Sequence, residues 1–404
     1  MKNFIKKESL HFKSLPQKAQ GLIISFFFYG AAYPIINTFI NSYIWRSNAS
    51  FSTLTVYRLG HFLLIPVIFL VNGFLLKKFK VVWLYFFGSL ILALSSISVI
   101  LFKINTIVDY FILGALYGIG FGFYWANRNY LTQQETDHAS RNYFFGLSFS
   151  TTTIISLVVT LASGWLIVFG LPYVALMIFA VTLLFIAGLK VVTSNYQTTN
   201  IGKLFITHPT EKWKVKRMIQ MGIGLFEGSA YFLPSLLILK MIGNEGVLGT
   251  LTALASVFSA ILIYIYGRKS ETEKHQKYFK ISIIFGLISS VILAYFFNWL
   301  AIVIYVLANG LIINFTWLTA GPLIMNNIDV EITNSEEKRF SYIFDGEMFI
   351  NMGRASAAVV CLILAIFIND DSALRYGSLI LSCLQVLLFI YLEKFRKRAP
   401  LTMV

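Results

Sequence analysis

Two charged side chains, Glu227 and Arg354, interrupt long apolar stretches of the 404-residue chain. A charge at the centre of a membrane-spanning segment costs roughly 2.5–3.5 kcal/mol on insertion scales. A chain that only had to remain in a bilayer could avoid this cost by placing leucine at both positions. The two charges therefore predict a polar path or site within the membrane, where Glu227 could bind a proton or a charged solute with Arg354 as its partner.

Arg354 also belongs to a polar stripe near the C-terminus. Glu347, Asn351 and Arg354 are spaced i, i+4 and i+7, so they lie along one face of a predicted helix. The stripe could act as a proton or anion relay with Arg354 as the counter-charge. Alternatively, Arg354 could form a buried pair with Glu347 or Glu227 that only locks the helices. Because a buried pair is costly to break in either case, a loss-of-function variant alone would not separate the two interpretations.

Polar and aromatic residues recur at intervals of four in two other apolar stretches, so each set shares one helix face. Pro34 and Pro234 lie in these stretches and predict bends, either functional ones or ordinary membrane-helix kinks. Asn314 and Trp317, further along the chain, could add hydrogen bonds and a stacking face for a ligand. The residues of the two stripes are Tyr29, Tyr33, Asn37 and Asn41 in the first, and Glu227, Tyr231 and Ser235 in the second.

Arg58 and His61 are spaced i, i+3 in a further apolar stretch and therefore share a face. Histidine is the side chain whose ordinary pKa lies closest to physiological pH, so His61 could take part in proton coupling. It could equally be a structural residue whose ring bonds a neighbouring carbonyl. Arg58 could contact the substrate or a carboxylate.

The stretches that carry these residues have the length and composition of membrane-spanning helices. The chain is 57% hydrophobic and 16% aromatic, which excludes an ordinary soluble protein and predicts an all-α membrane protein. Gly114, Gly118 and Gly122 carry GxxxG spacing, which predicts close helix packing. The twelve predicted spans cover residues 21–44, 53–76, 82–102, 106–126, 143–168, 173–192, 218–239, 247–266, 279–297, 299–321, 341–368 and 375–393.

The distribution of basic residues predicts the orientation of these spans. With the N-terminus inside, the inner segments carry 27 of the 33 Lys and Arg and the outer loops carry 4. This asymmetry follows the positive-inside rule and places both termini in the cytoplasm. It also accounts for the net charge of +15 without a nucleic-acid partner. Residues 1–20 mix lysines with apolar side chains and predict an amphipathic cytoplasmic segment, and residues 394–404 form a basic tail.

The spans divide into two similar halves. A hydrophilic cytoplasmic linker at 194–217 separates a six-helix bundle at 21–193 from a second one at 218–393. Short segments of the first half match segments of the second in the same order, which predicts duplication of a six-helix unit. An even number of spans per unit relates the halves by an axis along the membrane normal. The matching segments are 28–33 with 226–231, and 135–146 with 335–346.

In its six plus six spans, basic central loop and cytoplasmic termini, the chain resembles the major facilitator superfamily over essentially its whole length. An acidic cluster followed by arginine just before spans five and eleven is also similar to that superfamily. Two features depart from it: Lys77 stands where an aspartate is usual, and span five lacks the Gly-Pro motif of many proton-driven drug exporters. The resemblance implies a two-bundle fold and an alternating-access mechanism, without a substrate class.

The resemblance also implies where the functional surfaces lie. Spans one, four, seven and ten line the central cavity in this superfamily, so the stripes of spans one and seven are expected to face the substrate path. The charges before spans five and eleven are expected to close the cytoplasmic side in the outward-open state. Solvated loop charge is the alternative, because exposed pairs contribute little. These gate residues are Glu135, Asp137 and Arg141, together with Glu336, Glu337 and Arg339.

The sequence contains no HExxH, CxxC or P-loop motif and no catalytic grouping of Ser, His and Asp. We therefore expect neither an enzyme nor an ATP-driven pump, with no metal and no cofactor beyond a proton or other ion gradient. The prediction is a monomeric secondary active transporter, proton-coupled, that moves a small molecule across a bacterial plasma membrane. Its expected partners are that solute and the lipid bilayer. A uniporter of the same fold, a lipid flippase and a non-transporting membrane binding protein are the alternatives.

Overall fold

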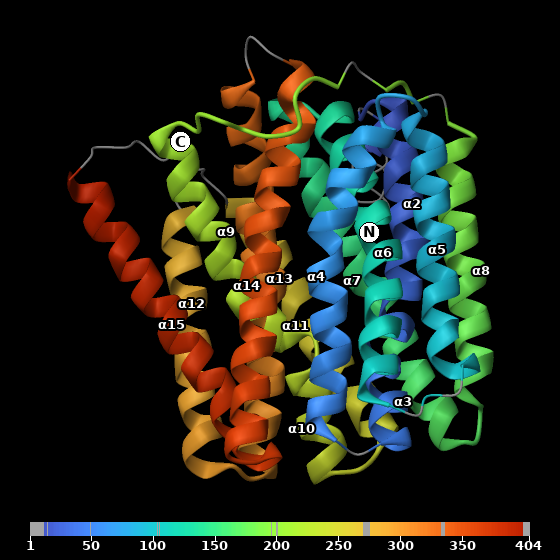
Figure 1. Ribbon diagram of the computed structural model, residues 1–404, viewed down its shortest axis with the longest axis vertical. Helices are drawn as coiled ribbons and strands as arrows, with labels where there is room; N and C mark the ends of the chain where they lie inside the picture. The colour runs from blue at the N-terminus through green and yellow to red at the C-terminus, as the bar shows by residue number, and fades with distance from the viewer. Residues whose placement is uncertain are drawn as a thin grey trace.

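The computed structural model is a bundle of long helices, most of which run from one end of the molecule to the other (Figure 1). In the ranges that it describes, every regular element is a helix, as predicted. The predicted segment at 1–20 and the tail at 394–404 fall largely outside these ranges. The structure describes residues 12–398 except 14, 49, 103, 105, 195, 199–200, 270–274 and 333–335, and it leaves out the side chains of 138–139, 262–269, 275–279 and 392–398.

The helices account for all twelve predicted spans. Ten of them, counted over the described residues, have the length and hydropathy of membrane spans, and α11 and α12 carry shorter apolar parts. The first half contains α2 (Gln17–Pro34), η1 (Ile35–Phe39), α3 (Ile40–Ser47), α4 (Phe51–Leu75), α5 (Val81–Leu101), α6 (Ile107–Glu135), α7 (His138–Val168) and α8 (Tyr173–Val192). The second half contains α9 (Glu211–Ala230), α10 (Leu233–Met241), α11 (Glu245–Lys269), α12 (His275–Phe296), α13 (Trp299–Glu331), η3 (Glu336–Lys338), α14 (Arg339–Phe367) and α15 (Asp370–Arg398).

The first and seventh spans are interrupted at matching points. Helix α2 ends at Pro34 and continues through the π-helical turn η1 into α3. Helix α9 ends at Ala230, and α10 starts with Pro234 in its first turn. Proline lacks the N–H that would continue the helical hydrogen bonds, so the chain bends at both places, as the sequence predicted. The bend frees the carbonyl of Tyr231, which accepts a hydrogen bond of 2.7 Å from Nδ2 of Asn41 in the other half.

The two halves lie side by side. In Figure 1 the blue-to-green helices α2 to α8 form one side of the bundle, and the helices from α10 to α15 form the other. Helix α4 packs against α14 and α7 packs against α11 across the interface. The chain crosses between the halves at a single end, through residues 193–210.

Glycines allow the closest helix contacts within each half. A Cβ at Gly114 would overlap the carbonyl of Tyr57, and a Cβ at Gly118 would overlap the carbonyl of His61. Helices α4 and α6 therefore touch through their backbones, which confirms the packing role predicted for this GxxxG spacing. In the second half, Gly224 meets the backbone of α14 in the same way.

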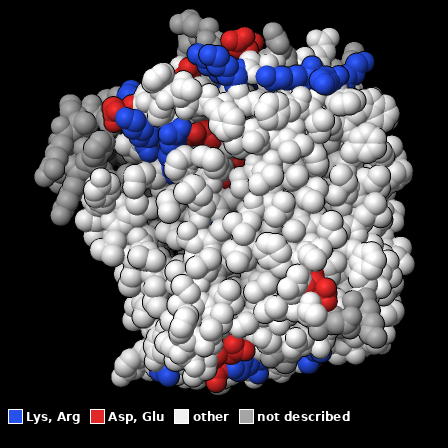
Figure 2. Space-filling view, viewed as in Figure 1, with Lys and Arg blue, Asp and Glu red and all other residues white. Residues whose placement is uncertain are grey.

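Charged residues gather at the two ends of the bundle. We name the end where α4 joins α5 and α8 joins α9 the basic end, since Lys77, Lys78 and Lys80 lie there. The end where α3 joins α4 and α10 joins α11 is the opposite end. Figure 2 shows Lys and Arg concentrated at the basic end, with a wide band between the ends in which this face is almost entirely uncharged. Such a band fits the hydrocarbon region of a bilayer, and the protein is a multi-pass membrane protein.

Candidate binding cavity between the two halves

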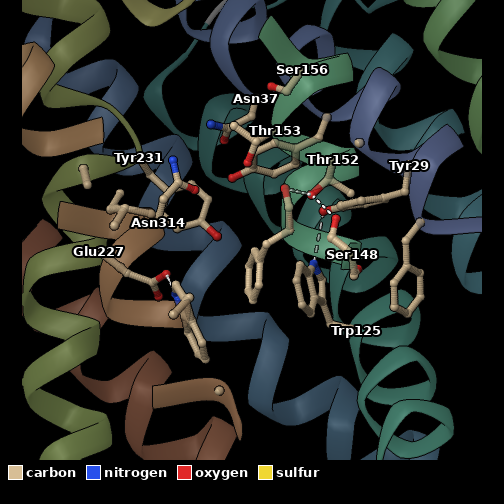
Figure 3. A pocket seen from close by; sticks show the side chains of 18 of the residues that line it. Tyr29, Asn37, Trp125, Ser148, Thr152, Thr153, Ser156, Glu227, Tyr231 and Asn314 are labelled. Carbon is tan, nitrogen blue, oxygen red and sulfur yellow. Dashed lines mark hydrogen bonds between the residues drawn. The ribbon is translucent and has the colours of Figure 1, made fainter. Parts of the chain in front are cut away.

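A cavity of about 400 Å³ lies between the halves, near the middle of the bundle. Its walls come from α2, α6 and α7 on one side and from α9, α11, α13 and α14 on the other. Figure 3 shows Glu227, Tyr231 and Asn314 on one side of this cavity, facing Tyr29 and Trp125 on the other. The predicted site residues that line it are Tyr29, Tyr33, Asn37, Glu227, Tyr231, Ser235, Asn314, Trp317, Glu347 and Arg354.

Glu227 and Arg354 form an ion pair beside this cavity. Nη2 of Arg354 lies 2.7 Å and Nε lies 3.0 Å from the same carboxylate oxygen, Oε2 of Glu227. The other oxygen accepts a hydrogen bond from the indole N–H of Trp317. Gly228, one residue beyond Glu227, fits against the backbone of Arg354, so α9 and α14 approach closely enough for the pair to form. Of the alternatives left open by the sequence, this geometry realises the direct pairing of Arg354 with Glu227.

Glu347 and Asn351 extend the pair into a network that reaches the other half. Asn351 accepts from Nη1 of Arg354 at 3.0 Å and donates to Oε2 of Glu347 at 3.2 Å. Glu347 itself lies 4.0 Å from Arg354, a much longer separation than that of the Glu227 pair. Asn129, on α6 of the first half, donates to Oε1 of Glu347 at 3.1 Å. A movement of the halves relative to one another would therefore change the surroundings of Glu347.

The stripe on α2 forms the aromatic wall of the cavity. The ring of Tyr29 stacks on Tyr124 with centroids 4.3 Å apart and packs against Tyr33 at 5.7 Å. The indole N–H of Trp125 donates to the hydroxyl of Tyr29 at 3.2 Å. These contacts hold the rings in fixed orientations, so this wall can present π-faces and a phenol to a ligand.

Arg58 and His61 lie behind the cavity wall rather than in it. Arg58 is fully buried, and its Nη2 donates to the carbonyl of Asn37 at 3.0 Å and to Oδ1 of Asn41 at 2.5 Å. Its guanidinium lies 5.6 Å from the ring centroid of Tyr231. Within the described part of the chain no carboxylate pairs with it, so the predicted carboxylate contact is absent.

His61 is enclosed by aromatic rings. Its ring centroid lies 4.7 Å from that of Tyr117, 4.9 Å from Phe121 and 5.8 Å from Tyr231. Neither ring nitrogen has a hydrogen-bond partner among the described residues, so the structural alternative of a bonded carbonyl is not realised. Access of protons to His61 would require a rearrangement of these rings.

The gate pairing expected before span five is wrong. The guanidinium of Arg141 bonds neither Glu135 nor Asp137, although its backbone N–H donates to the Asp137 carbonyl at 2.9 Å. Its Nη1 lies 2.5 Å from Asp329 on α13, which continues ten residues beyond the predicted end of span ten. Asp137 instead caps α7, accepting from the backbone N–H of Ser140 at 2.8 Å, and its own N–H bonds the Ser140 hydroxyl. The carboxylate that closes this end across the halves therefore comes from α13 and not from the loop.

Of the remaining predicted gate charges, Glu336 and Arg339 make the expected contact, whereas Glu135 and Glu337 do not do so among the described contacts. Glu135 lies 4.0 Å from Lys18, within the first half. Glu336 is highly exposed and lies 4.0 Å from Arg339, three residues along the same segment. The backbone carbonyl of Glu337 accepts from the N–H of Gly202 at 2.9 Å, while no ion pair of its side chain appears among the described contacts. Glu336 is therefore solvated, as the alternative held, whereas the side chains of Glu135 and Arg339 are only 11% and 13% exposed.

The opposite end is closed by a second ion pair between the halves. Nε and Nη2 of Arg46, on α3, lie 2.7 Å and 3.0 Å from the two carboxylate oxygens of Glu245 at the start of α11. The hydroxyl of Tyr173, which begins α8, donates to the same carboxylate at 2.9 Å. A two-point arginine–carboxylate contact fixes orientation as well as distance. Together with Arg141 and Asp329, this pair ties the halves together on both sides of the cavity.

Two further groups in the cavity wall escaped the sequence analysis. Arg128, counted there as a cytoplasmic loop charge, lies on α6 with its guanidinium over the rings of Phe26 and Trp125. A row of hydroxyls on α7 also faces the cavity, as Figure 3 shows. Their spacing of four residues was a detectable signal, since it places them on one helix face. These hydroxyl residues are Ser148, Thr152, Ser156 and Thr160.

The sequence is similar to those of two bacterial proteins that are described as uncharacterized. No protein-family model matches the sequence. The uncharacterized protein YqgE of Bacillus subtilis is 26% identical over 385 residues, covering 91% of this chain and 87% of that protein. An uncharacterized protein encoded in the sodM 3' region of Geobacillus stearothermophilus is 31% identical over 140 residues, covering 35% of this chain and 65% of its own length.

Solved structures of transporters superimpose on nearly the whole chain. The human organic anion transporter MFSD10 aligns with a TM-score of 0.64 at 10% identity, over 92% of this chain and 99% of its own. The nucleoside transporter NupG aligns with a TM-score of 0.63 at 16% identity, over 94% and 99%. The Escherichia coli fucose:proton symporter FucP aligns with a TM-score of 0.61 at 15% identity, over 93% and 97%. The chain therefore has the twelve-helix fold of the major facilitator superfamily, as its sequence predicted.

Proposed function

We propose that the protein is a secondary active transporter that moves a small polar solute across the membrane by alternating access, coupled to protons. The observation that carries this proposal is a cavity, lined by both halves and containing the Glu227–Arg354 pair, between two halves that are tied together at both ends. A solute held there reaches one side only when Arg46 and Glu245 separate, and the other only when Arg141 and Asp329 separate. Rocking of one half against the other would break these contacts in turn.

Proton coupling is assigned to Glu227. Its carboxylate is buried, lines the cavity and pairs with Arg354, so protonation would release the arginine to Asn351 and Glu347. Because Glu347 also bonds Asn129 across the interface, such a release would act on a contact between the halves. A solute bound in the cavity and a proton bound to Glu227 would therefore both act on the hydrogen-bond network that joins Glu227, Arg354 and Glu347.

The similar solved structures support transport and leave the solute open. Their names give an organic anion, a nucleoside and fucose as solutes, and a proton as the coupling ion of the fucose transporter. One fold therefore accommodates different solutes through different side chains in its cavity. We infer a bacterial plasma membrane with both termini in the cytoplasm, from the basic end and from the Bacillus and Geobacillus relatives. We also infer a monomer, because one chain encloses the cavity.

Crosslinking would test alternating access once the screen described below has found a transported solute. Cys361 and Cys383 would first be replaced by alanine. Paired cysteines would then be introduced at Arg46 and Glu245, or at Arg141 and Asp329 for the basic end. A reducible bifunctional reagent should lock either end and abolish flux, and reduction should restore it. Flux that continues with both ends locked would exclude alternating access.

Coupling would be tested in proteoliposomes that contain a pH-sensitive dye, with a panel of metabolites, sugars, amino acids and lipids. We expect a transported solute to move protons with it, and Glu227→Gln to abolish the dependence on the pH gradient. Solute movement by the native protein that ignores the gradient would instead identify a uniporter. Headgroup-labelled lipid that changes leaflet, with no movement of soluble compounds, would identify a flippase. Ligand binding without any flux would leave a non-transporting binding protein.

A further inference from the structure

The charges around the cavity comprise a cluster about Glu227 and Arg354 and a half-buried arginine, Arg128, that lies apart from it. Arg58 and Arg354 each lie 5.6 Å from the ring centroid of Tyr231, and the two carboxylates of Glu227 and Glu347 lie beside Arg354. Two carboxylates therefore compensate Arg354, whereas Arg58 has only neutral hydrogen-bond partners among the described residues. Ion pairs nearer the basic end, such as Arg217 with Asp345, are balanced.

Arg128 has no such compensation. Its guanidinium carbon lies 4.1 Å from the ring centroids of both Phe26 and Trp125 and 5.5 Å from that of Tyr29. Among the described side chains no carboxylate pairs with it, and no hydrogen bond uses any of its N–H groups. Stacking orients the planar group and leaves its five donors available at the cavity wall. A guanidinium held in this way is suited to bind an oxyanion through two parallel hydrogen bonds.

The walls beside Arg128 suit the remainder of a polar solute. On α7 the hydroxyl of Thr152 donates to the carbonyl of Ser148 at 2.8 Å, and that of Thr160 donates to Ser156 at 2.6 Å. Because these hydroxyl groups donate their proton to a carbonyl of their own helix, their oxygen atoms face the cavity as hydrogen-bond acceptors. Figure 3 shows Ser148 and Thr152 next to Trp125 and facing the cavity. Ligand hydroxyl or amine groups could donate to this row.

We propose that the transported solute is a small oxyanion, a carboxylate or phosphate monoester that also carries hydroxyl or amine groups, and that Arg128 binds its charge between Phe26 and Trp125. This inference rests on the proposed transport function and adds the class of solute. The bound anion neutralises the cation that, among the described residues of the cavity wall, has no carboxylate partner, which lowers the cost of closing the cavity around that charge. A neutral solute with the same carbon skeleton does not neutralise Arg128 and therefore binds more weakly than the anion.

Thermal unfolding of the detergent-purified protein would test the assignment with matched pairs of compounds. The carboxylate arm compares gluconate with sorbitol, lactate with 1,2-propanediol, and succinate with 1,4-butanediol. The phosphate arm compares glycerol 3-phosphate with glycerol, and inorganic phosphate serves as the bare anion. We expect at least one anion to raise the unfolding temperature while its neutral partner does not, and the responding arm identifies the oxyanion.

Three variants separate binding from stacking. Arg128→Gln should retain the folded state and weaken anion binding roughly tenfold or more, because a charge-assisted contact is lost. Arg128→Lys keeps the charge without the planar fork and should recover part of the affinity. The matched control is Arg375→Gln, since Arg375 also stacks on two rings, Phe297 and Tyr376, away from the cavity. It should bind anions as the native protein does.

Several outcomes would overturn the assignment: equal stabilisation by an anion and its neutral partner, no response to any anion, or full anion binding by Arg128→Gln. Counterflow of the binding anion in proteoliposomes then separates this inference from the transport function. Anion binding that needs Arg128 but produces no counterflow would refute transport and leave the anion site. Counterflow of neutral solutes that is unaffected in Arg128→Gln would refute the anion site and leave transport.

Discussion

Replacing Glu227 by glutamine should destabilise the protein by about 3 kcal/mol, because it leaves Arg354 buried without its main partner. Removal of one partner from a buried ion pair typically costs roughly 3–5 kcal/mol. Three N–H groups now meet the carboxylate, two from Arg354 and one from Trp317. Glutamine offers one acceptor oxygen and turns an NH₂ group toward one of these donors. Glu347, 4.0 Å from Arg354, compensates part of the loss, so we expect the lower end of the range.

A double-mutant cycle isolates the contribution of the pair itself. Arg354→Gln alone strands the Glu227 carboxylate, whereas the double variant strands neither charge. The double variant should therefore be more stable than the sum of the single effects predicts, by about 2 kcal/mol or more. The four proteins would be unfolded with SDS in mixed micelles and followed by tryptophan fluorescence. A control cycle on Glu211 and Lys214, an exposed pair 2.6 Å apart, should give a coupling of about 0.5 kcal/mol or less.

Additive effects, within about 0.5 kcal/mol, would refute this reasoning. They would mean that the 2.7 Å contact between Arg354 and Glu227 contributes no net energy to the folded state. A single Glu227→Gln variant as stable as the native protein would refute it as well. The stability cycle is independent of transport, so it separates the structural role of the pair from any role in coupling.

Three further predictions follow from the interface and the helix packing. Glu245→Gln should loosen the opposite end. A cysteine introduced at Thr252 in the cavity should then react faster with a membrane-impermeant maleimide applied from that end. An unchanged rate would show that the ion pair does not hold that end closed. Asp329→Asn should increase labelling of the same cysteine from the basic end, and labelling from the wrong side would contradict the assignment. Gly114→Ala should lower stability by about 1–3 kcal/mol, because its Cβ overlaps a backbone carbonyl, whereas Gly146→Ala, with open space around it, should be neutral in the same SDS unfolding assay.

The fold and the central ion pair could be predicted from the sequence because both follow from strong local signals. A charge in an apolar helix must be compensated nearby, so Glu227 and Arg354 were natural candidates for each other. The proline breaks and the GxxxG contacts likewise depend on residue type at a fixed spacing. Each of these features places a severe steric or electrostatic constraint on a few neighbouring residues.

The contacts between the halves could not be predicted in this way. Asp329 lies on helical residues beyond the predicted end of span ten, and the ends of helices are the least certain part of a hydropathy pattern. Glu245 and Arg46 are about two hundred residues apart, and no local pattern relates them. Arg128 was assigned to a loop by the same error in a helix boundary, although α6 continues to Glu135. The errors at Asp329 and Arg128 share one physical cause, since polar residues extend helices beyond the apolar part that spans the membrane.

The two ends of the cavity are closed by contacts that differ in burial, and this difference bears on the order of opening. Arg46 is 46% exposed, so water and salt screen much of its attraction to Glu245. Arg141 is only 1% exposed, and besides Asp329 it donates to an amide and to a backbone carbonyl. Separating Arg141 from its partners would strand a buried guanidinium, whereas Arg46 would be hydrated as it leaves and the buried Glu245 would keep its hydrogen bond from Tyr173. The closed protein should therefore open first at the opposite end, and opening at the basic end requires a ligand or a proton to supply the difference.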